Sequence, residues 1–128
     1  MNMIDIKDKY RTLVELLFKK TQSGSLLWDY DGFSEELMTS VAKRQIVVTQ
    51  AVNTNREPLI RVEIRNPQKS KVEIFTDESL EGATPSIGAF ETYYVLMDAL
   101  RNNAIRAATG ADEDVDAILE ELDDEIPF

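Results

Sequence analysis

Apolar side chains near the start of the chain recur at the spacing of one helix face. Successive gaps of four, three, one and three residues place them on a single stripe of an amphipathic helix. Asp5 is a suitable N-cap residue, and Gly24 is a suitable residue to end the helix. The pattern therefore predicts a helix from about Asp5 to about Thr21. The stripe consists of Ile6, Tyr10, Leu13, Val14 and Leu17.

Between Ser25 and Thr76 the pattern changes to short runs rich in β-branched and aromatic residues, separated by polar turns. Asp31-Gly32 is a strong hairpin signal. Around residues 60–65, apolar and charged residues alternate, which is typical of a strand with one buried face. Because no connection is long enough for a parallel crossover, an antiparallel meander is predicted. The predicted strands are Leu26–Tyr30, Phe33–Val41, Gln45–Val52, Leu59–Arg65 and Lys71–Phe75, and Phe33–Val41 also fits the start of a helical turn.

Helical spacing returns after a predicted loop at Asp77–Pro85. A second helix is expected from about Ser86 to Gly110, a typical helix terminator. Asp112 is the expected N-cap of a short third helix. The apolar positions are Phe90, Tyr93, Tyr94, Met97 and Leu100 in the second helix, and Val115, Ile118, Leu119 and Leu122 in the third.

The order of these elements predicts an α+β fold. An N-terminal helix is followed by an antiparallel meander of about five strands and by two C-terminal helices packed on the sheet. A chain of 128 residues is close to the usual size of one domain. We therefore expect a single α+β domain over residues 1–122 and a short extended acidic tip at residues 123–128.

The charge of the chain is unevenly distributed. Residues 1–75 carry 12 basic and 10 acidic side chains, giving +2, whereas residues 76–128 carry 2 basic and 14 acidic side chains, giving −12. At neutral pH the C-terminal part therefore repels phosphate groups and attracts basic protein surfaces. The N-terminal part is left open to either kind of partner.

The composition argues against an enzyme, a cofactor site or a membrane protein. The sequence has no cysteine and no histidine, so thiolate ligands, the commonest metal ligand and the commonest general base are all missing. No apolar run approaches the roughly 18 residues needed to cross a bilayer, and the N-terminus lacks the layout of a secretion signal. We expect a cytoplasmic non-enzyme without a cofactor, and the sequence does not set its oligomeric state.

The last six residues form a distinct chemical unit of three acids followed by isoleucine, proline and phenylalanine. Pro127 disfavours the helical region at Ile126, so this segment is expected to project as an extended peptide. An extended peptide that ends in an aromatic ring and a carboxylate suits a partner pocket that is apolar inside and basic at its rim.

This segment resembles the C-terminal tip of bacterial single-stranded DNA-binding proteins, which has the form acid-acid-acid-Ile-Pro-Phe, usually with three aspartates. Glu125 is the only departure. The resemblance implies that helicases, exonucleases, primosome proteins and recombination mediators bind the tip through the terminal phenylalanine and its carboxylate. Carried over to this chain, the electrostatic lead is Asp123, Asp124 and Glu125, and the anchor is Ile126, Pro127 and Phe128.

The resemblance does not extend to the rest of the chain. Ordinary members of that family begin with an oligonucleotide-binding β-barrel and reach the tip through a long linker rich in glycine, proline and glutamine. This chain begins with a predicted helix and has no such linker. It is either a divergent or phage-encoded single-strand binder with the same tip, or a mimic that recruits or blocks repair enzymes. Alternatively, Phe128 packs back onto the protein's own core.

Binding of single-stranded DNA requires a basic groove with aromatic faces for base stacking. The predicted strands offer residues of both kinds. Glu57, Glu63 and Glu73 interleave with the basic residues, so a mixed-charge solvated sheet face is the alternative explanation. The candidate DNA-binding residues are Trp28, Tyr30, Lys43, Arg44, Arg61, Arg65 and Lys71.

Two functional classes follow from the sequence. The first is a protein of DNA replication, recombination or repair that docks on its partner through Phe128. The second is a small acidic inhibitor or immunity protein, which would cover a basic toxin or nuclease surface with the acids of residues 112–125.

Overall fold

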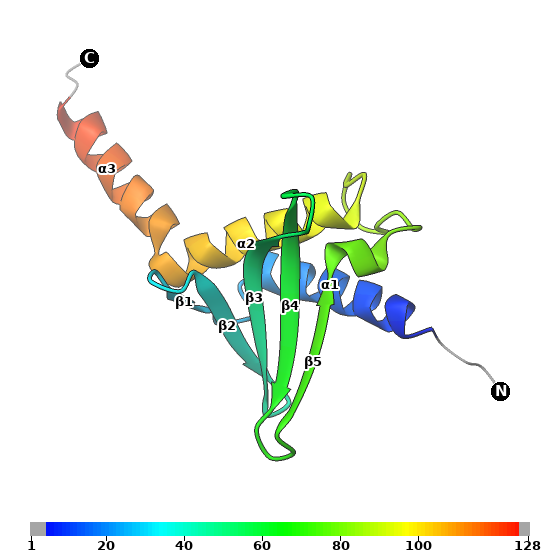
Figure 1. Cartoon of the computed structure of the whole chain (residues 1–128). Coiled ribbons are helices and arrows are strands. Elements are labelled where there is room, and N and C mark those ends of the chain that lie inside the picture. The colour runs from blue at the N-terminus through cyan, green and yellow to red at the C-terminus, as the bar shows by residue number, and fades with distance from the viewer. Residues whose placement is uncertain (1–4, 126–128) are drawn as a thin grey trace.

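The structure, a computed structural model, describes residues 5–125 of the chain. It contains an N-terminal helix, a five-stranded antiparallel sheet and two C-terminal helices, which confirms the α+β fold class (Figure 1). In chain order the elements are α1 (Ile6–Gln22), β1 (Asp29–Asp31), β2 (Glu36–Val41), β3 (Arg44–Val52), β4 (Pro58–Asn66), β5 (Lys71–Thr76), the 3-10 helix η1 (Asp77–Leu80), α2 (Tyr93–Thr109) and α3 (Ala111–Glu125).

Helix α1 forms where the apolar stripe predicts it. The Asp5 carboxylate accepts a hydrogen bond from the backbone N–H of Lys7 at 3.0 Å, which satisfies one of the free donors at the start of the helix. After the helix, Gly24 adopts a φ of +78°, in the left-handed region that glycine enters without steric cost. Val14 and Leu17 of the predicted stripe are buried.

The five strands lie in the sheet in the order in which they occur in the chain, and each pairs antiparallel with the next. Their register places Leu37, Val48, Val62 and Phe75 in one row across β2–β5, and all four are buried. Because side chains alternate between the two faces of a strand, the residues that flank this row point to the opposite face. The sheet therefore has one apolar face and one mixed face.

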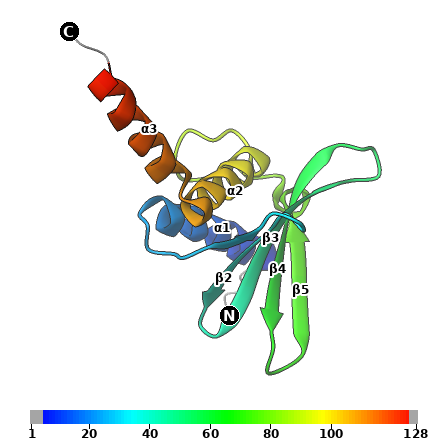
Figure 2. The same cartoon turned by 90° about the vertical axis from the view of Figure 1, so that its left-hand side faces the viewer.

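Helices α1 and α2 cover the apolar face, while the opposite face is turned away from them (Figure 2). Tyr10 of α1 stacks on Phe75 of β5, with ring centroids 4.1 Å apart. The Tyr10 hydroxyl donates a hydrogen bond to the Glu73 carboxylate. Burial, aided by this bond and by the charge of Glu73, raises the pKa of Tyr10 to about 12. Tyr10 thus joins the helix to the edge of the sheet.

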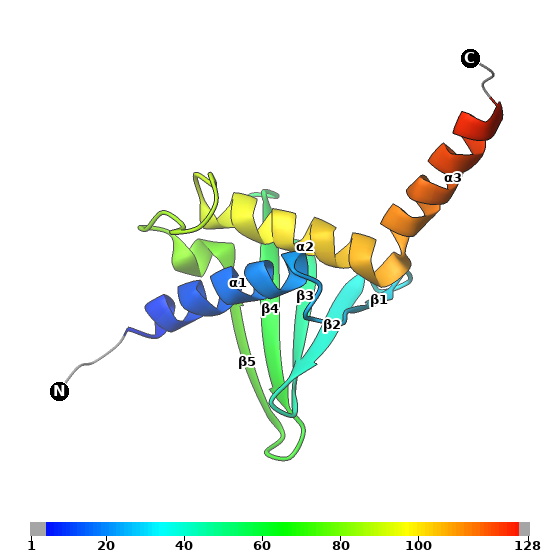
Figure 3. The same cartoon turned by 180° about the vertical axis from the view of Figure 1, so that it is seen from behind.

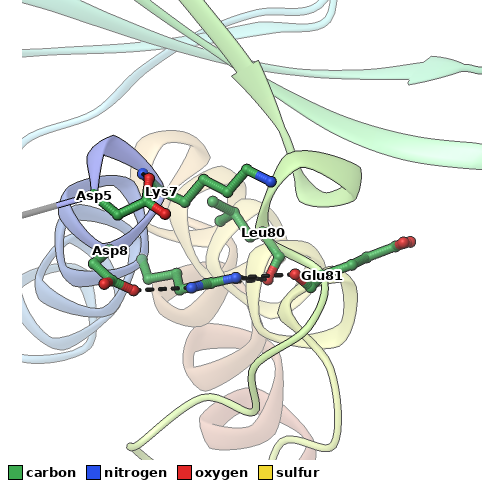
Figure 4. Close-up of polar contacts among 6 residues, drawn as sticks. Asp5, Lys7, Asp8, Leu80 and Glu81 are labelled. Atoms are coloured by element: carbon green, nitrogen blue, oxygen red, sulfur yellow. Dashed lines mark hydrogen bonds and ion pairs between the residues drawn. The ribbon is translucent and has the colours of Figure 1, made fainter.

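Arg11 ties α1 to the segment that follows the sheet (Figure 4). Its guanidinium donates hydrogen bonds to the Leu80 carbonyl oxygen, from Nε at 3.1 Å and from Nη2 at 3.0 Å. Nη2 also donates to the Glu81 carbonyl oxygen at 2.9 Å, and Nη1 pairs with the Asp8 carboxylate at 2.9 Å. The stretch predicted as a loop therefore begins with a turn of 3-10 helix that α1 holds in place.

Helix α2 begins at Tyr93, later than the predicted start near Ser86. Thr92 caps the helix, because its side chain accepts a hydrogen bond from the backbone N–H three residues later at 3.2 Å. Phe90 lies before the helix and packs edge-on against Phe18 of α1, with ring centroids 5.2 Å apart. Phe90 fits the spacing of the predicted helix, but it lies in the preceding loop, and its ring is partly buried by its contact with α1.

Helix α3 starts directly after Gly110, which has a φ of +69° and ends α2. The predicted cap, Asp112, instead lies in the first turn of α3 and pairs with Arg106. The helix contacts the end of α2 and projects away from the sheet (Figures 1 and 3). The prediction that both C-terminal helices pack on the sheet is therefore correct for α2 and wrong for α3.

Helix α3 also extends further than predicted, through Glu125. Residues 123–125, expected to be part of an extended tip, are therefore helical. The physical reason is that Pro127 first disfavours the helical region at the residue just before it, and not earlier. The predicted boundary between domain and tip, at residue 122, thus falls inside a helix, and residues 126–128 lie outside the described part of the chain.

Candidate docking surfaces

Helix α3 has an apolar stripe that is open to solvent. Its four side chains follow the i, i+3, i+4, i+7 spacing of one helix face, and their exposed fractions lie between 46% and 57%. Amphipathic helices normally bury this face against another element. An exposed apolar face of this kind is a candidate docking surface. We call Val115, Ile118, Leu119 and Leu122 the α3 stripe.

The remainder of α3 is strongly acidic. Between Ala111 and Glu125 the helix has nine acidic residues and no basic residue. Acids in the first turn interact favourably with the positive end of the helix dipole, whereas those in the last turn lie at its negative end. Two such helices would repel each other, and a basic protein surface would attract either one. Helix α3 is therefore suited to a basic partner surface.

The predicted docking tip continues from this helix. Asp123 is exposed in the last described turn, while the side chains of Asp124 and Glu125 lie outside the described part. Ile126, Pro127 and Phe128 lie outside it as well. The structure places the start of the tip on a helix that extends away from the folded body (Figure 1).

Trp28, a predicted stacking residue for DNA, lies in the core. It is 5% exposed, and its indole N–H donates a hydrogen bond to Thr21 Oγ1 at 2.9 Å. Tyr30 is half-buried against the core cluster and pairs with Leu37, a residue of the helix-covered face. The burial of Trp28 contradicts its assignment to DNA stacking, because the large ring fills the interior between α1 and the sheet.

Arg61 and Arg65 lie on the opposite sheet face, where carboxylates neutralise them. Glu63 lies between them in β4, with Oε1 at 2.7 Å from Arg61 Nη2 and Oε2 at 2.9 Å from Arg65 Nη2. Glu36 of β2 places Oε2 at 3.5 Å from the same Arg65 nitrogen. Both arginines therefore participate in ion pairs within a mixed-charge face.

The other basic candidates lie elsewhere. Lys43 and Arg44 are exposed at the β2–β3 turn, where Lys43 has a φ of +64°. Lys71 begins β5, and its side chain lies outside the described part. Tyr30 and Arg65 line one hollow of about 250 Å³, but three carboxylates line it as well, those of Asp29, Asp31 and Glu36. Within residues 5–125, the candidates therefore do not form one basic groove.

We expect a single-stranded DNA oligonucleotide to show no electrophoretic shift with this protein at about 150 mM salt. The candidate arginines are already paired, and the chain carries a net charge of −10. A saturable shift at that salt concentration, weakened by Arg61→Ala or Arg65→Ala, would contradict the mixed-charge interpretation of the sheet face.

An apolar groove between α1 and the β2–β3 hairpin is not indicated by the sequence pattern. Its volume is about 390 Å³, and it includes Leu16 and Val41, which are 49% and 42% exposed. One signal is present in the sequence, since Leu16 is an apolar residue outside the predicted stripe of α1. We call this the α1 groove, which is lined by Leu13, Leu16, Leu17, Lys20, Ser25, Leu26, Val41 and Ile46.

Asp77 is an ionisable residue in the interior, 6% exposed. Its Oδ1 accepts a hydrogen bond from the buried backbone N–H of Ile60 at 2.7 Å. Burial raises the pKa of Asp77 above its ordinary value, against the opposing effect of this bond. The role of Asp77 is therefore structural, since it satisfies a buried donor where β4 meets η1.

Within residues 5–125, no group of three or more histidine, cysteine, aspartate or glutamate side chains is placed to hold a metal ion. No helix in that range has the length and apolar character required to cross a bilayer.

Comparison with protein-family models, curated proteins and solved structures finds no match to this chain.

Proposed function

We propose that this protein docks, through residues 123–128, on enzymes of DNA replication, recombination or repair that recognise the tip of bacterial single-stranded DNA-binding proteins. The observation that carries the proposal is the position of α3. The helix holds its acids away from the folded body, and its own apolar stripe is exposed rather than packed on the sheet. The last described turn of α3, where Asp123 is exposed, is therefore accessible to another protein.

The expected docking follows from the chemistry of the segment. The ring of Phe128 fills an apolar pocket, and a basic residue on the partner binds its carboxylate by charge-assisted hydrogen bonds. The acids of α3 and the tip increase the rate of encounter with the basic rim of that pocket. The partner class is therefore a DNA-maintenance protein with a basic, apolar pocket for a C-terminal phenylalanine.

Within this proposal, a mimic of the tip is favoured over a single-strand binder. Trp28 is buried, and Arg61 and Arg65 are paired with carboxylates, so the body offers little for DNA. A protein that presents the tip without binding DNA would recruit or block the enzymes that normally follow single-stranded DNA-binding proteins.

The test is a titration of the full chain with a helicase or exonuclease that binds the family's tip. Deletion of Phe128 should weaken binding by at least about tenfold, because it removes both the ring and its carboxylate from the pocket. One alanine appended after Phe128 should weaken it as well, since the carboxylate is displaced.

Phe33 supplies a matched control for this titration. It is a fully exposed phenylalanine in the β1–β2 turn, so Phe33→Ala removes an aromatic ring that is not part of the tip. This variant should bind like the wild type. Unchanged binding after loss of Phe128 would reject the proposal.

The acidity of α3 supports a second candidate, an inhibitor that covers a basic toxin or nuclease surface. Such a partner would be bound by the helix surface and not by the terminal ring. Binding to the basic toxin or nuclease should then be abolished when four acids of α3 are replaced by their amides, whereas deletion of Phe128 should have no effect on it. The four acids are Asp114, Asp116, Glu120 and Glu121.

A further inference from the structure

Two apolar surfaces of this chain are exposed, one on a helix and the other in a groove. The α3 stripe is convex, and its side chains are about half exposed. The α1 groove is concave, and it exposes Leu16 and Val41 to a similar extent. An amphipathic helix lying in a hydrophobic groove is a common mode of protein recognition. Each surface therefore has a suitable counterpart within the same chain.

The charges around the two surfaces are also complementary. Helix α3 has nine acids and no basic residue. Lys20 lines the groove, Lys19 is exposed beside it in α1, and Lys43 and Arg44 follow Val41 in the β2–β3 hairpin. Opposite charges around an apolar centre attract a helix and orient it in the groove. The same charges disfavour pairing of one α3 with another.

The two surfaces lie toward the same end of the molecule. Thr21 and Gln22, at the end of α1, line a hollow together with Arg106 near the end of α2 and Asp112 in the first turn of α3. Lys20 of the groove directly precedes Thr21. Helix α3 nevertheless projects away from α1, so its stripe does not reach the groove of its own chain (Figure 3).

We infer that two copies of this protein exchange their α3 helices, each placing its α3 stripe in the α1 groove of the other. Because each copy supplies one stripe and one groove, a pair related by a twofold axis makes two equivalent contacts and forms a closed dimer. Gly110, whose left-handed conformation separates α2 from α3, sets the direction in which the helix leaves the body. This inference goes beyond the proposed function and does not rest on it.

Sedimentation of the full chain over roughly 5 to 500 μM tests the exchange. The wild type should show a monomer–dimer equilibrium. Leu119→Glu in the stripe and Leu16→Glu in the groove should each raise the dissociation constant at least about tenfold, because both place a charge in an apolar contact. Circular dichroism of both variants confirms that they are folded.

Two controls test whether the loss of dimer is specific to the two surfaces. One tests for a general effect of an added charge, and the other tests for a contribution of the tip. Val95→Glu changes a side chain of α2 that is 45% exposed and lies outside both surfaces, so it should leave the dimer intact. Deletion of residues 126–128 should also leave it intact, even if it abolishes docking on DNA-maintenance enzymes. Wild type that remains monomeric over the whole range would overturn the inference.

Cross-linking identifies which surfaces meet, and the absence of native cysteine makes single-cysteine variants unambiguous. With oxidised glutathione as the oxidant, which is reduced to two glutathione thiols, a mixture of Leu16→Cys and Ile118→Cys should form a disulfide between the two variants faster than either variant forms one with itself. Faster homodimer formation by Ile118→Cys alone would show that the α3 helices pair with each other, which would overturn the exchange.

Discussion

Leu100→Ala should lower the free energy of unfolding by about 2–5 kcal/mol, whereas Leu119→Ala should change it by less than about 0.5 kcal/mol. Both variants remove the same atoms from a helix. Leu100 in α2 is 0% exposed, so its loss leaves a cavity in the core, while Leu119 in α3 is 55% exposed. Urea unfolding at roughly 1 μM protein, where self-association contributes least, provides the measurement.

This pair of variants tests whether α3 stands apart from the body. If Leu119→Ala lowered the free energy of unfolding almost as much as Leu100→Ala does, the α3 stripe would be packed on the domain in solution. The α3 stripe would then be unavailable, and both the proposed docking and the exchange of helices would lose their structural basis.

Asp77→Asn should increase stability at neutral pH, and Asp77→Ala should be about 1–3 kcal/mol less stable than Asp77→Asn. The asparagine removes a desolvated charge but keeps a carbonyl oxygen for the buried N–H of Ile60. We expect its amide N–H groups to be hydrated, because Asp77 lines a hollow. Alanine removes the charge and leaves the donor without an acceptor. Chemical denaturation of the three proteins checks the order.

The pH dependence of stability provides an independent check on Asp77. Because burial raises its pKa in the folded state, the protonated form is favoured by folding, and the stability from this group is complete below the ordinary value of 3.8. That stability is lost as the pH rises through the folded pKa. The advantage of Asp77→Asn over wild type should therefore decrease toward acid pH. An advantage that grows as the pH falls would contradict this assignment.

Features set by neighbouring residues were predictable from the sequence. Asp5 caps α1 and Gly110 ends α2 as expected, because both roles depend on a few adjacent backbone groups. The alternation of Ile60, Val62 and Ile64 likewise follows from the period of a single strand, and it defines the two faces of β4. The fold class then follows from the order of these elements.

Features set by distant contacts were not predictable in this way. The loop before α2 is held to α1 by Glu15, whose carboxylate accepts a hydrogen bond from the Ser86 N–H at 2.6 Å. Ser86, the predicted start of α2, is therefore held outside the helix by a residue far away in the chain. The stripe of α3 predicts burial, but α1 and α2 already cover the apolar face of the sheet.

The same distinction between local and distant contacts applies to the candidate docking surfaces. The acidic tip is a continuous segment, so its chemistry is evident from sequence, and its docking stays a prediction. The α1 groove is formed by α1, the loop after it and the ends of two strands, so Leu16 alone, an apolar residue outside the predicted stripe, does not define it. Trp28 has the aromatic ring that base stacking requires, and its burial and its hydrogen bond to Thr21 show that it belongs to the core.

The most direct test of the proposed docking is a displacement measurement. A labelled peptide with the tip sequence of a bacterial single-stranded DNA-binding protein is bound to its partner exonuclease, and the full chain is added as competitor. We predict that the wild type displaces the peptide and that Phe128→Ala requires at least about tenfold more protein. Failure of the wild type to displace it at concentrations on the order of 100 μM, or equal displacement by Phe128→Ala, would contradict the account.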